Sequence, residues 1–349
     1  MARMMSVVVF IDYCSASPLL HSHHNRTAVS PKSKQQRGKE KKGERRWQKQ
    51  KNAQGARVAR MRRMEVRIGI SGWNYTGWRG VFYPQDLPHR RELEFASRLL
   101  NSIEINGSFY SLQRPTSYRR WYEATPENFL FSVKGARFIT HMKKLREVEV
   151  PLANFFASGV LALEEKLGPI LWQFPPNFGW NVDRFRKFFQ LLPKSTKEAA
   201  LLGRRHDAKL KVRACLKTER DRPLRYCVEI RHPSFLVSDF FELLRKFNVA
   251  FVFADTARKW PYAEDLTADF VYCRLHGDTK LYTSGYNEGA LDRWSVRLKL
   301  WRQGKQPADA KLVTAKTKPA PRDVFVYFDN DAKVHAPFDA QSLACKMKQ

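Results

Sequence analysis

The sequence has few cysteines, and no two of them stand in a spacing typical of a metal or redox motif. Without a CxxC pair, it predicts neither a zinc ribbon nor a thioredoxin-like centre. The five cysteines are Cys14, Cys215, Cys227, Cys273 and Cys345. Two of them, Cys227 and Cys273, lie inside strand-like apolar runs, where buried and unreactive thiols are the usual finding. The composition therefore favours a reducing, cytoplasmic compartment.

Long apolar runs are also missing. No run approaches the ~20 residues of a membrane helix, so the sequence predicts no membrane contact. The run SVVVFI at 6–11 is short and is followed by Asp12. CSASP at 14–18 resembles the end of a signal peptide, which leaves secretion open as the less favoured alternative. GISGW at 69–73 lacks the spacing of a P-loop or dinucleotide fingerprint, and no HExxH motif is present.

Acidic residues are scarce relative to basic ones. The chain has 63 Lys and Arg but 34 Asp and Glu, which gives a net charge of +29. Residues 1–64 carry +13 of this charge, and residues 65–349 carry +16. A basic body permits nucleic acid or a phosphorylated substrate as a partner, although a cationic solvated surface explains the same charge.

The N-terminal segment differs in composition from the rest. Residues 30–63 are rich in Lys, Arg, Gln and Gly and contain almost no large apolar side chains, so they cannot bury enough surface to fold. We expect a disordered basic tail over 1–63 and a single folded domain over 64–349. Met61 and Met64 directly precede the first strand-like run, and the alternative is that the tail is an over-extended gene start.

Eight short apolar runs recur, and each ends in a polar or charged residue. Most are separated by stretches with helical periodicity, a pattern that predicts an α/β fold, the (β/α)8 TIM barrel. In this fold the site lies at the carboxyl ends of the strands, which we call the mouth. The runs are RIGISGW (67–73), SIEING (102–107), FLFSVKG (129–135), PILWQFPP (169–176), YCVEIRH (226–232), AFVFADT (250–256), FVYCRLHG (270–277) and DVFVYFDN (323–330).

Helical patterns fill most of the intervals between the runs. The expected helices cover 89–100, 115–125, 151–168, 182–193, 237–247, 291–301 and 336–347. The third is expected to end at Gly168, because glycine commonly terminates helices. Residues 194–222 are basic and predicted to be irregular, 258–269 lack a helical period, and 303–322 are expected to form a surface loop.

Alternation along a strand decides which polar side chains point into the barrel together. Glu104 and Asn106 share one face of their run, and Ile103 and Ile105 take the other. Similar polar residues end the other runs, which predicts a ligand-binding or catalytic mouth rather than a set of structural ion pairs. The catalytic candidates are Glu104, Lys134, Glu229 and His276, and the binding candidates are Trp73, Asn106, Gln173, Asp255, Arg274 and Asn330.

The position of Lys134 at the end of a strand agrees with two different roles in function. A strand-end lysine with a lowered pKa can attack a carbonyl and form a Schiff base. The plainer alternative is that Lys134 neutralises a substrate phosphate or Glu104. His276 suits general acid or base catalysis, because the ordinary pKa of histidine lies near neutral pH. Glu104, Glu229, Asp255 and His276 are residue types that a divalent metal accepts, but no familiar metal-binding spacing supports a metal, so the cofactor stays open.

The runs and their flanking segments resemble the YecE-like family, grouped as domain of unknown function 72. The matching motifs, in order over about residues 66–346, are IGISGWNYTGWRGVFYP, SIEINGSFY, FSVKGARFITH, ILWQFPPNF, VEIRHPSF, FADT, RLHGD followed by YTSGY, and VYFDND. The resemblance implies a TIM barrel with a pocket lined by the ten candidates above. Asp329 stands where many relatives are expected to have Asn, which leaves its role in doubt, and the N-terminal tail has no counterpart.

Three functions agree with these features. The first is an enzyme that acts on a polar or anionic small molecule of the sugar or phosphate class. In it, Glu104 or Glu229 moves a proton, Lys134 and Arg274 hold negative charge, and His276 relays protons. The second is a nucleic-acid-binding or metal-dependent endonuclease-like protein, which the basic charge and the aromatic residues near the mouth suggest. The third is a binding protein without turnover. The oligomeric state is not predicted.

Overall fold

A computed structural model describes residues 64–210 and 214–348 of the chain. All eight runs predicted from the sequence form strands, which pair in parallel and in order, with β8 returning to β1. The (β/α)8 TIM barrel is therefore confirmed, while the tail predicted over 1–63 lies outside the described residues. The strands are β1 (Val66–Ser71), β2 (Ser102–Ile105), β3 (Leu130–Lys134), β4 (Leu167–Gln173), β5 (Tyr226–Glu229), β6 (Val249–Asp255), β7 (Phe270–Leu275) and β8 (Asp323–Phe328).

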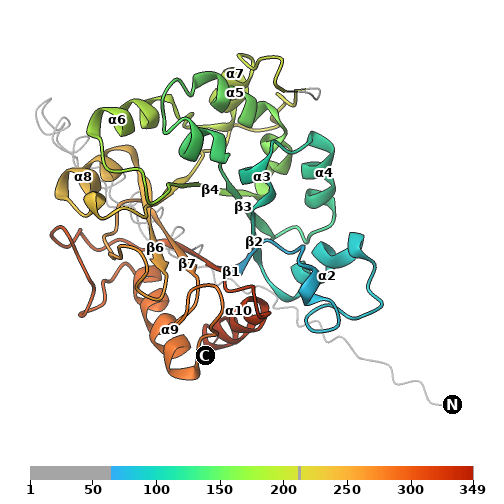
Figure 1. Ribbon diagram of the computed structural model, residues 1–349, viewed down its shortest axis with the longest axis vertical. Helices are drawn as coiled ribbons and strands as arrows, with labels where there is room; N and C mark the ends of the chain where they lie inside the picture. The colour runs from blue at the N-terminus through green and yellow to red at the C-terminus, as the bar shows by residue number, and fades with distance from the viewer. Residues whose placement is uncertain (1–63, 211–213, 349) are drawn as a thin grey trace, which may run out of the picture. The chain divides into compact units, whose positions relative to one another are not determined.

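The α-helices surround the strands, which lie at the centre of the view in Figure 1. They are α2 (Glu92–Leu99), α3 (Gly107–Tyr110), α4 (Pro115–Glu123), α5 (Glu149–Ala157), α6 (Val182–Leu191), α7 (Thr196–Gly203), α8 (Ser238–Phe247), α9 (Glu288–Arg302) and α10 (His335–Lys346). Single turns and short helices of other types are η1 (Thr76–Trp78), η2 (His89–Arg91), η3 (Phe138–Met142), η4 (Val160–Lys166) and η5 (Pro233–Phe235). None of the helices in the described residues has the length and apolarity needed to span a bilayer.

Two intervals differ from the prediction. The helix expected over 151–168 ends at Ala157, because Gly159 adopts a φ of 122° that breaks it, and Gly168 lies inside β4. Residues 194–222, predicted to be irregular, contain α7, which begins where Ser195 accepts a hydrogen bond from the Glu198 amide. The segments 258–269 and 303–322 contain neither helix nor strand, as predicted.

The apolar core has two layers, one on each side of the strands. Side chains that point outward, such as Ile103 and Ile105, pack against the helices. Side chains that point inward fill the barrel itself, and they include Leu171, Phe270 and Phe325. Both faces of each strand are thus buried, which explains why the runs are nearly continuous in hydrophobicity up to their polar ends.

Glycine at position 69 lets β1 approach β2 closely. A Cβ atom added at Gly69 would lie 1.8 Å from the backbone oxygen of Ser102. We expect Gly69→Ala to force the strands apart and to lower the free energy of unfolding by about 1–3 kcal/mol in urea denaturation. Gly77→Ala is the matched control, because an added Cβ there meets nothing within 4 Å. Equal stabilities of the two variants would contradict the expectation.

Candidate active site

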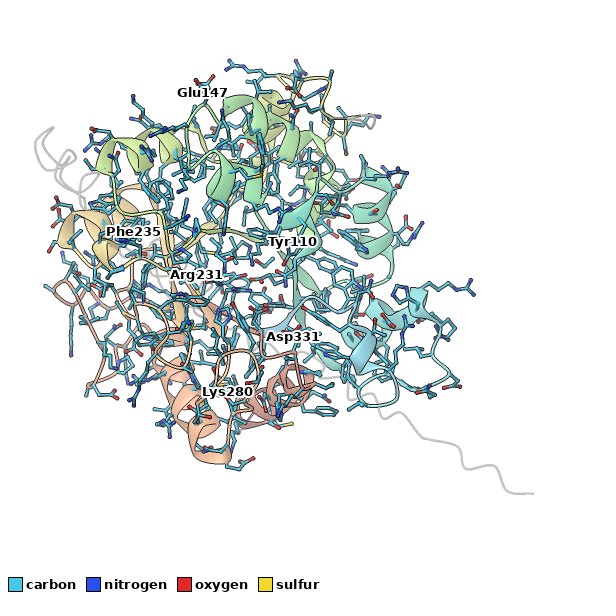
Figure 2. The ribbon with its side chains drawn as sticks, viewed as in Figure 1. Tyr110, Glu147, Arg231, Phe235, Lys280 and Asp331 are labelled. Atoms are coloured by element: carbon cyan, nitrogen blue, oxygen red, sulfur yellow. The ribbon has the colours of Figure 1, made fainter. Side chains whose placement is uncertain are left out.

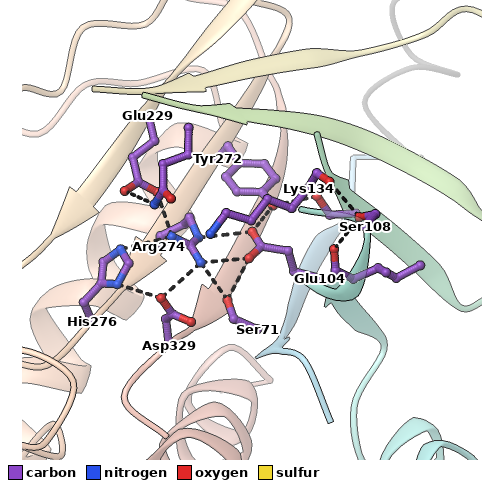
Figure 3. A network of polar contacts seen from close by, with 12 residues as sticks. Ser71, Glu104, Ser108, Lys134, Glu229, Tyr272, Arg274, His276 and Asp329 are labelled. Carbon is purple, nitrogen blue, oxygen red and sulfur yellow. Dashed lines mark hydrogen bonds and ion pairs between the residues drawn. The ribbon is translucent and has the colours of Figure 1, made fainter. Parts of the chain in front are cut away.

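A buried ion network lies at the mouth, with the guanidinium of Arg274 at its centre (Figure 3). Arg274 Nη2 and Nε donate to the two carboxylate oxygens of Glu104 over 2.8 and 3.1 Å. Its Nη1 donates to Glu229 over 2.7 Å, and its Nη2 also contacts Asp329 over 3.1 Å. Arg274, Glu104 and Glu229 are fully buried. One cation thus holds three carboxylates at the point where the inward faces of the strands converge.

Strand alternation and register explain this convergence. Tyr272 and Arg274 are two residues apart on β7, so both point inward, and Tyr272 Oη donates to Glu104 over 2.6 Å. Glu104 of β2 pairs in register with Ser71 of β1, whose hydroxyl donates to the Glu104 carboxylate over 3.0 Å. Gln173 pairs in register with Glu229 and donates to it over 2.7 Å. Each carboxylate is therefore fixed by its neighbours as well as by Arg274.

The charges of the network hold two of its carboxylates, those of Glu229 and Asp329, in the ionised form. Burial alone would raise the pKa of Glu229, but Arg274 and Arg231 hold it well below the usual range for a glutamate. Burial would likewise raise the pKa of Asp329, which Arg274 and His276 instead lower far below its usual value. Groups that stay ionised at all physiological pH values are poor proton donors, so these two side chains serve as fixed negative charges.

His276 lies beside the network and is fully buried. Its Nδ1 is 2.9 Å from Asp329 Oδ2, and its Nε2 is 3.4 Å from Arg274 Nη1. The two ring nitrogens thus lie beside opposite charges, Nδ1 beside a carboxylate and Nε2 beside a guanidinium. The rings of Tyr282 and Trp260 contact the imidazole, with centroids 5.4 and 6.4 Å away. The histidine therefore faces the network and not the solvent.

Lys134 differs from the other charged groups of the mouth. Its ammonium lies 4.5 Å from the centre of the Phe109 ring, and the residue is 8% exposed. Within residues 64–210 and 214–348 its Nζ forms no hydrogen bond or ion pair, because Glu104 is engaged by Arg274. Burial, followed by the charge of Arg274, lowers the pKa of Lys134 to about 8, despite the opposing effect of Glu104. A lysine with this pKa is partly neutral at physiological pH.

A second arginine lies over the mouth on the β5 side. Arg231 Nε donates to Glu229 over 3.1 Å, and its Nη2 donates to the hydroxyl of Tyr282 over 3.3 Å. Its guanidinium lies 3.7 Å from the centre of the Trp260 ring. Figure 2 shows Arg231 near the middle of the view, with Tyr110 and Asp331 on the other side of the centre. The Arg231 side chain is 14% exposed, so it presents positive charge to the mouth.

Comparison with known proteins identifies the family. The family described as "Protein of unknown function DUF72" matches residues 67–349. The chain belongs to the DUF72 family. The YecE-like resemblance predicted from the motifs is thereby confirmed.

Two curated relatives, both named as UPF0759 proteins, match part of the chain. The UPF0759 protein YunF of Bacillus subtilis strain 168 is 29% identical over 121 residues, which is 32% of this chain and 41% of YunF. The UPF0759 protein YecE of Escherichia coli K12 is 28% identical over 114 residues, which is 33% of this chain and 39% of YecE. The aligned region thus spans less than half the length of either relative.

Crystal structures of two DUF72 family proteins share the fold. The protein from Thermotoga maritima has a TM-score of 0.63 at 22% identity, over 82% of this chain and 100% of that protein. The protein from Enterococcus faecalis has a TM-score of 0.58 at 17% identity, over 81% of this chain and 96% of that protein. At these identities, the likeness concerns the barrel and not its chemistry.

The structure brings six of the ten candidates together at the mouth. Five of them form the network or line it, namely Glu104, Gln173, Glu229, Arg274 and His276, and Lys134 is the sixth, within electrostatic range of its charges. Asn106 directly follows β2, and its side chain partly offsets the effect of burial, which raises the pKa of Tyr75. Their roles in function stay predictions.

Three binding candidates lie elsewhere. Asp255 points away from the barrel axis and accepts a hydrogen bond from Tyr286 over 3.1 Å. Asn330 donates to Asp339 of α10 over 2.8 Å. Trp73 packs edge-on against Trp121 of α4, with ring centroids 5.3 Å apart. Asp255 and Asn330 were placed at the mouth as the last polar residues of their runs, but side-chain alternation turns each of them outward.

Sequence analysis missed several residues of the mouth. Asp329, whose role was left in doubt, contacts both Arg274 and His276. It shares the inward face with Tyr327, two residues earlier on β8, and this alternation was a usable signal. Arg231, two residues after Glu229 in the run 226–232, was not among the candidates. Tyr282 and Trp260 come from loops, and no periodic signal could have placed them over the mouth.

A metal site does not emerge from the described residues, which contain no group of three or more His, Cys, Asp or Glu side chains arranged to hold an ion. Glu104 and Glu229 direct carboxylate oxygens at Arg274 instead of at a common open point. Asp255, which was considered as a fourth ligand, bonds Tyr286. The predicted ligand set is thus not brought together around one position.

Proposed function

We propose that the chain is an enzyme that acts on a small anionic carbonyl compound at the mouth, with Lys134 as its reactive group. The observation that carries the proposal is a buried lysine amine without an ion-pair partner among the described residues, held beside a network of fixed charges. The plainer role considered for this residue, neutralising Glu104, loses support because Arg274 already engages that carboxylate through two hydrogen bonds.

The lowered pKa gives Lys134 a reactive form at neutral pH. With a pKa of about 8, roughly a tenth of the amines are neutral at pH 7, against fewer than about one in 10³ for an ordinary lysine. Only the neutral amine has a lone pair that can attack a carbonyl or accept a proton. The residue is also held close to the Phe109 ring, which limits its motion.

The other groups of the mouth suit an anionic, polar substrate. Arg231 presents a guanidinium whose Nε and Nη2 are fixed by Glu229 and Tyr282. Such a group binds a carboxylate or phosphate. Asn106 Oδ1 is buried and has no hydrogen-bond partner among the described residues. A buried acceptor without a partner is costly, so a donor on a bound ligand would stabilise this site.

The chemistry follows from these positions. The Nζ lone pair of Lys134 forms a bond to the carbonyl carbon, and the carbonyl π electrons move to oxygen. The oxygen takes up one proton from the attacking nitrogen and one from a general acid, and the C–O bond breaks as water leaves. The nitrogen lone pair then forms the second C–N bond of an iminium ion, which withdraws electrons from the adjacent carbon. Burial and the neighbouring Asp329 raise the pKa of Asp331 to about 6. Asp331 is therefore suited to transfer protons near neutral pH.

Reductive trapping tests the proposal. We expect glyoxylate with cyanoborohydride to label Lys134 in the native protein, and mass spectrometry of the peptides to locate the added group. The labelling rate should rise with pH around a midpoint of about 8, because labelling requires the neutral amine. Lys166 is an internal control, since its buried Nζ is engaged by the carbonyl oxygens of Tyr122 and Thr125.

Two outcomes would overturn the proposal. One is labelling of surface lysines only, with Lys134 unmodified at every pH. The other is labelling of Lys134 with a pH midpoint near the pKa of an ordinary lysine, about 10.4. Such a midpoint would mean that the surroundings of Lys134 do not lower its pKa.

A further inference from the structure

A groove of about 560 Å³ lies beside the mouth, lined by residues of α3, η3 and α5 and of the chain around them. Its volume falls in the range of small-molecule sites, ~300–1,000 Å³. Figure 2 labels two of its lining residues, Tyr110 near the centre of the view and Glu147 at the edge. None of the ten candidates predicted from the sequence lines this groove.

The backbone around the groove has an unusual conformation. The segment Phe138–Met142 forms the π-helix η3, a type that often occurs at functional sites. After it, Lys144, Leu145 and Glu147 have φ values of 46°, 64° and 49°, although none is glycine. Non-glycine residues in the left-handed region are held there by surrounding structure, and they concentrate at ligand sites.

The groove adjoins the reactive lysine. Phe109 lines the groove, and the centre of its ring lies 4.5 Å from Lys134 Nζ. The same ring packs edge-on against His141, with centroids 5.0 Å apart. The Phe109 ring therefore borders both the groove and the amine.

The lining is mainly apolar and aromatic, and it also includes the charged residues Arg137, Lys143, Glu147, Asp207 and Lys209. Two of its large apolar side chains, Tyr110 and Met142, are 65% and 66% exposed. The guanidinium of Arg137 lies 5.5 Å from the centre of the Tyr110 ring. Lys143 is paired with Glu147 over 3.0 Å, whereas Arg137 forms no ion pair within the part of the chain that the structure describes. The exposed aromatic face and the adjacent cation complement a flat anionic molecule.

We propose that this groove binds the flat aromatic part of the substrate, with its acid group at Arg137, while the carbonyl end reaches Lys134. This inference rests on the proposed function and narrows the substrate class to aromatic carbonyl acids. The groove would thus provide most of the binding energy, and Lys134 would carry out the reaction. Small aliphatic carbonyl acids would meet the lysine without contacting the groove.

The test compares two probes in the same trapping assay. 4-Carboxybenzaldehyde has a flat ring with an acid group, whereas glyoxylate has no ring and is too small to fill the groove. We expect Tyr110→Ala, Arg137→Ala and Val150→Trp each to raise the half-saturating concentration of 4-carboxybenzaldehyde at Lys134 roughly tenfold, while glyoxylate labelling changes less than twofold. Phe338→Ala is the matched control, because Phe338 is a 45% exposed aromatic residue that does not line the groove.

Equilibrium binding of 2-naphthoate, measured by calorimetry, gives a readout that does not depend on the lysine. The groove variants should weaken it about as much as they weaken 4-carboxybenzaldehyde. If glyoxylate labels Lys134 but the groove variants affect neither aromatic probe, the inference is wrong and the proposed function stands. If 2-naphthoate binds in the groove but Lys134 traps neither aldehyde, the proposed function fails, and the groove is not a part of its site.

Discussion

Replacing Arg274 by methionine is expected to lower the free energy of unfolding by about 3–5 kcal/mol, as for other buried ion pairs that lose one partner. The guanidinium is the shared partner of Glu104, Glu229 and Asp329, and the first two are fully buried with it. Methionine fills a similar space but leaves Glu104 without a cationic hydrogen-bond partner and Glu229 with Arg231 alone. Urea denaturation at pH 7 measures the change, and the surface control is Arg186→Met, which removes an exposed pair with Asp183 and should cost less than about 1 kcal/mol.

A rescue experiment separates lost charge compensation from lost packing. Adding Glu104→Gln and Glu229→Gln to the Arg274→Met variant removes the charges of both fully buried carboxylates and should recover a large part of the lost stability. No recovery in the triple variant would mean that packing explains the loss. If Arg274→Met alone lowered the free energy of unfolding by less than about 1 kcal/mol, the description of these residues as a buried ion network would be contradicted.

The strands could be predicted from the sequence because a barrel strand has a distinctive pattern. Its apolar run is short and nearly continuous, and its polar residues gather at one end, as in the run from Phe129 to Lys134. Helix ends were less predictable. Gly168 resembled a terminator, but the break came at Gly159, and only the backbone conformation distinguishes the two. The helix α7 was missed although Ser195 and Glu198 form a recognisable helix start.

The residues that were assigned to the mouth because of side-chain alternation along a strand do point into the barrel. Glu104, Lys134, Glu229 and Arg274 lie inward as their parity requires. On β6 and β8 the last polar residue was chosen instead, and Asp255 and Asn330 turn outward.

The remaining features depend on contacts between segments distant in sequence, and for that reason no pattern predicts them. Trp260 and Tyr282 reach Arg231 from two different loops. The lowered pKa of Lys134 depends on its burial and on the charge of Arg274, which comes from a distant strand. The groove likewise depends on the π-helix η3, which no periodic pattern in the sequence predicts.

Replacing Lys134 by methionine is expected to abolish the chemistry of the mouth while making the barrel more stable. We use pyruvate as the probe, because an iminium ion at its carbonyl carbon would speed the exchange of its methyl protons for deuterium. Exchange followed by nuclear magnetic resonance in deuterated water should fall at least about 10³-fold in Lys134→Met and also in Lys134→Arg, which keeps the charge but has no nucleophilic amine.

The stability gain has a defined dependence on pH. Lys134 has a pKa of about 8 in the folded chain and about 10.4 when unfolded, so between these values the unfolded chain binds more protons and the wild type gains stability as pH rises. Below pH 8 the wild type bears the full cost of the buried charge, and Lys134→Met should exceed it by up to about 3 kcal/mol. Above about pH 10.4 the difference should vanish.

Lys166→Met is the matched control, because Lys166 is also buried and its pKa is also lowered by burial. Its Nζ donates to the backbone carbonyls of Tyr122 and Thr125, so its loss should destabilise the barrel and leave deuterium exchange unchanged. Opposite effects on stability and exchange in the two variants would separate a reactive lysine from a structural one. If Lys134→Met instead destabilised the chain and left exchange unchanged, Lys134 would be a structural residue, and the proposed chemistry would be wrong.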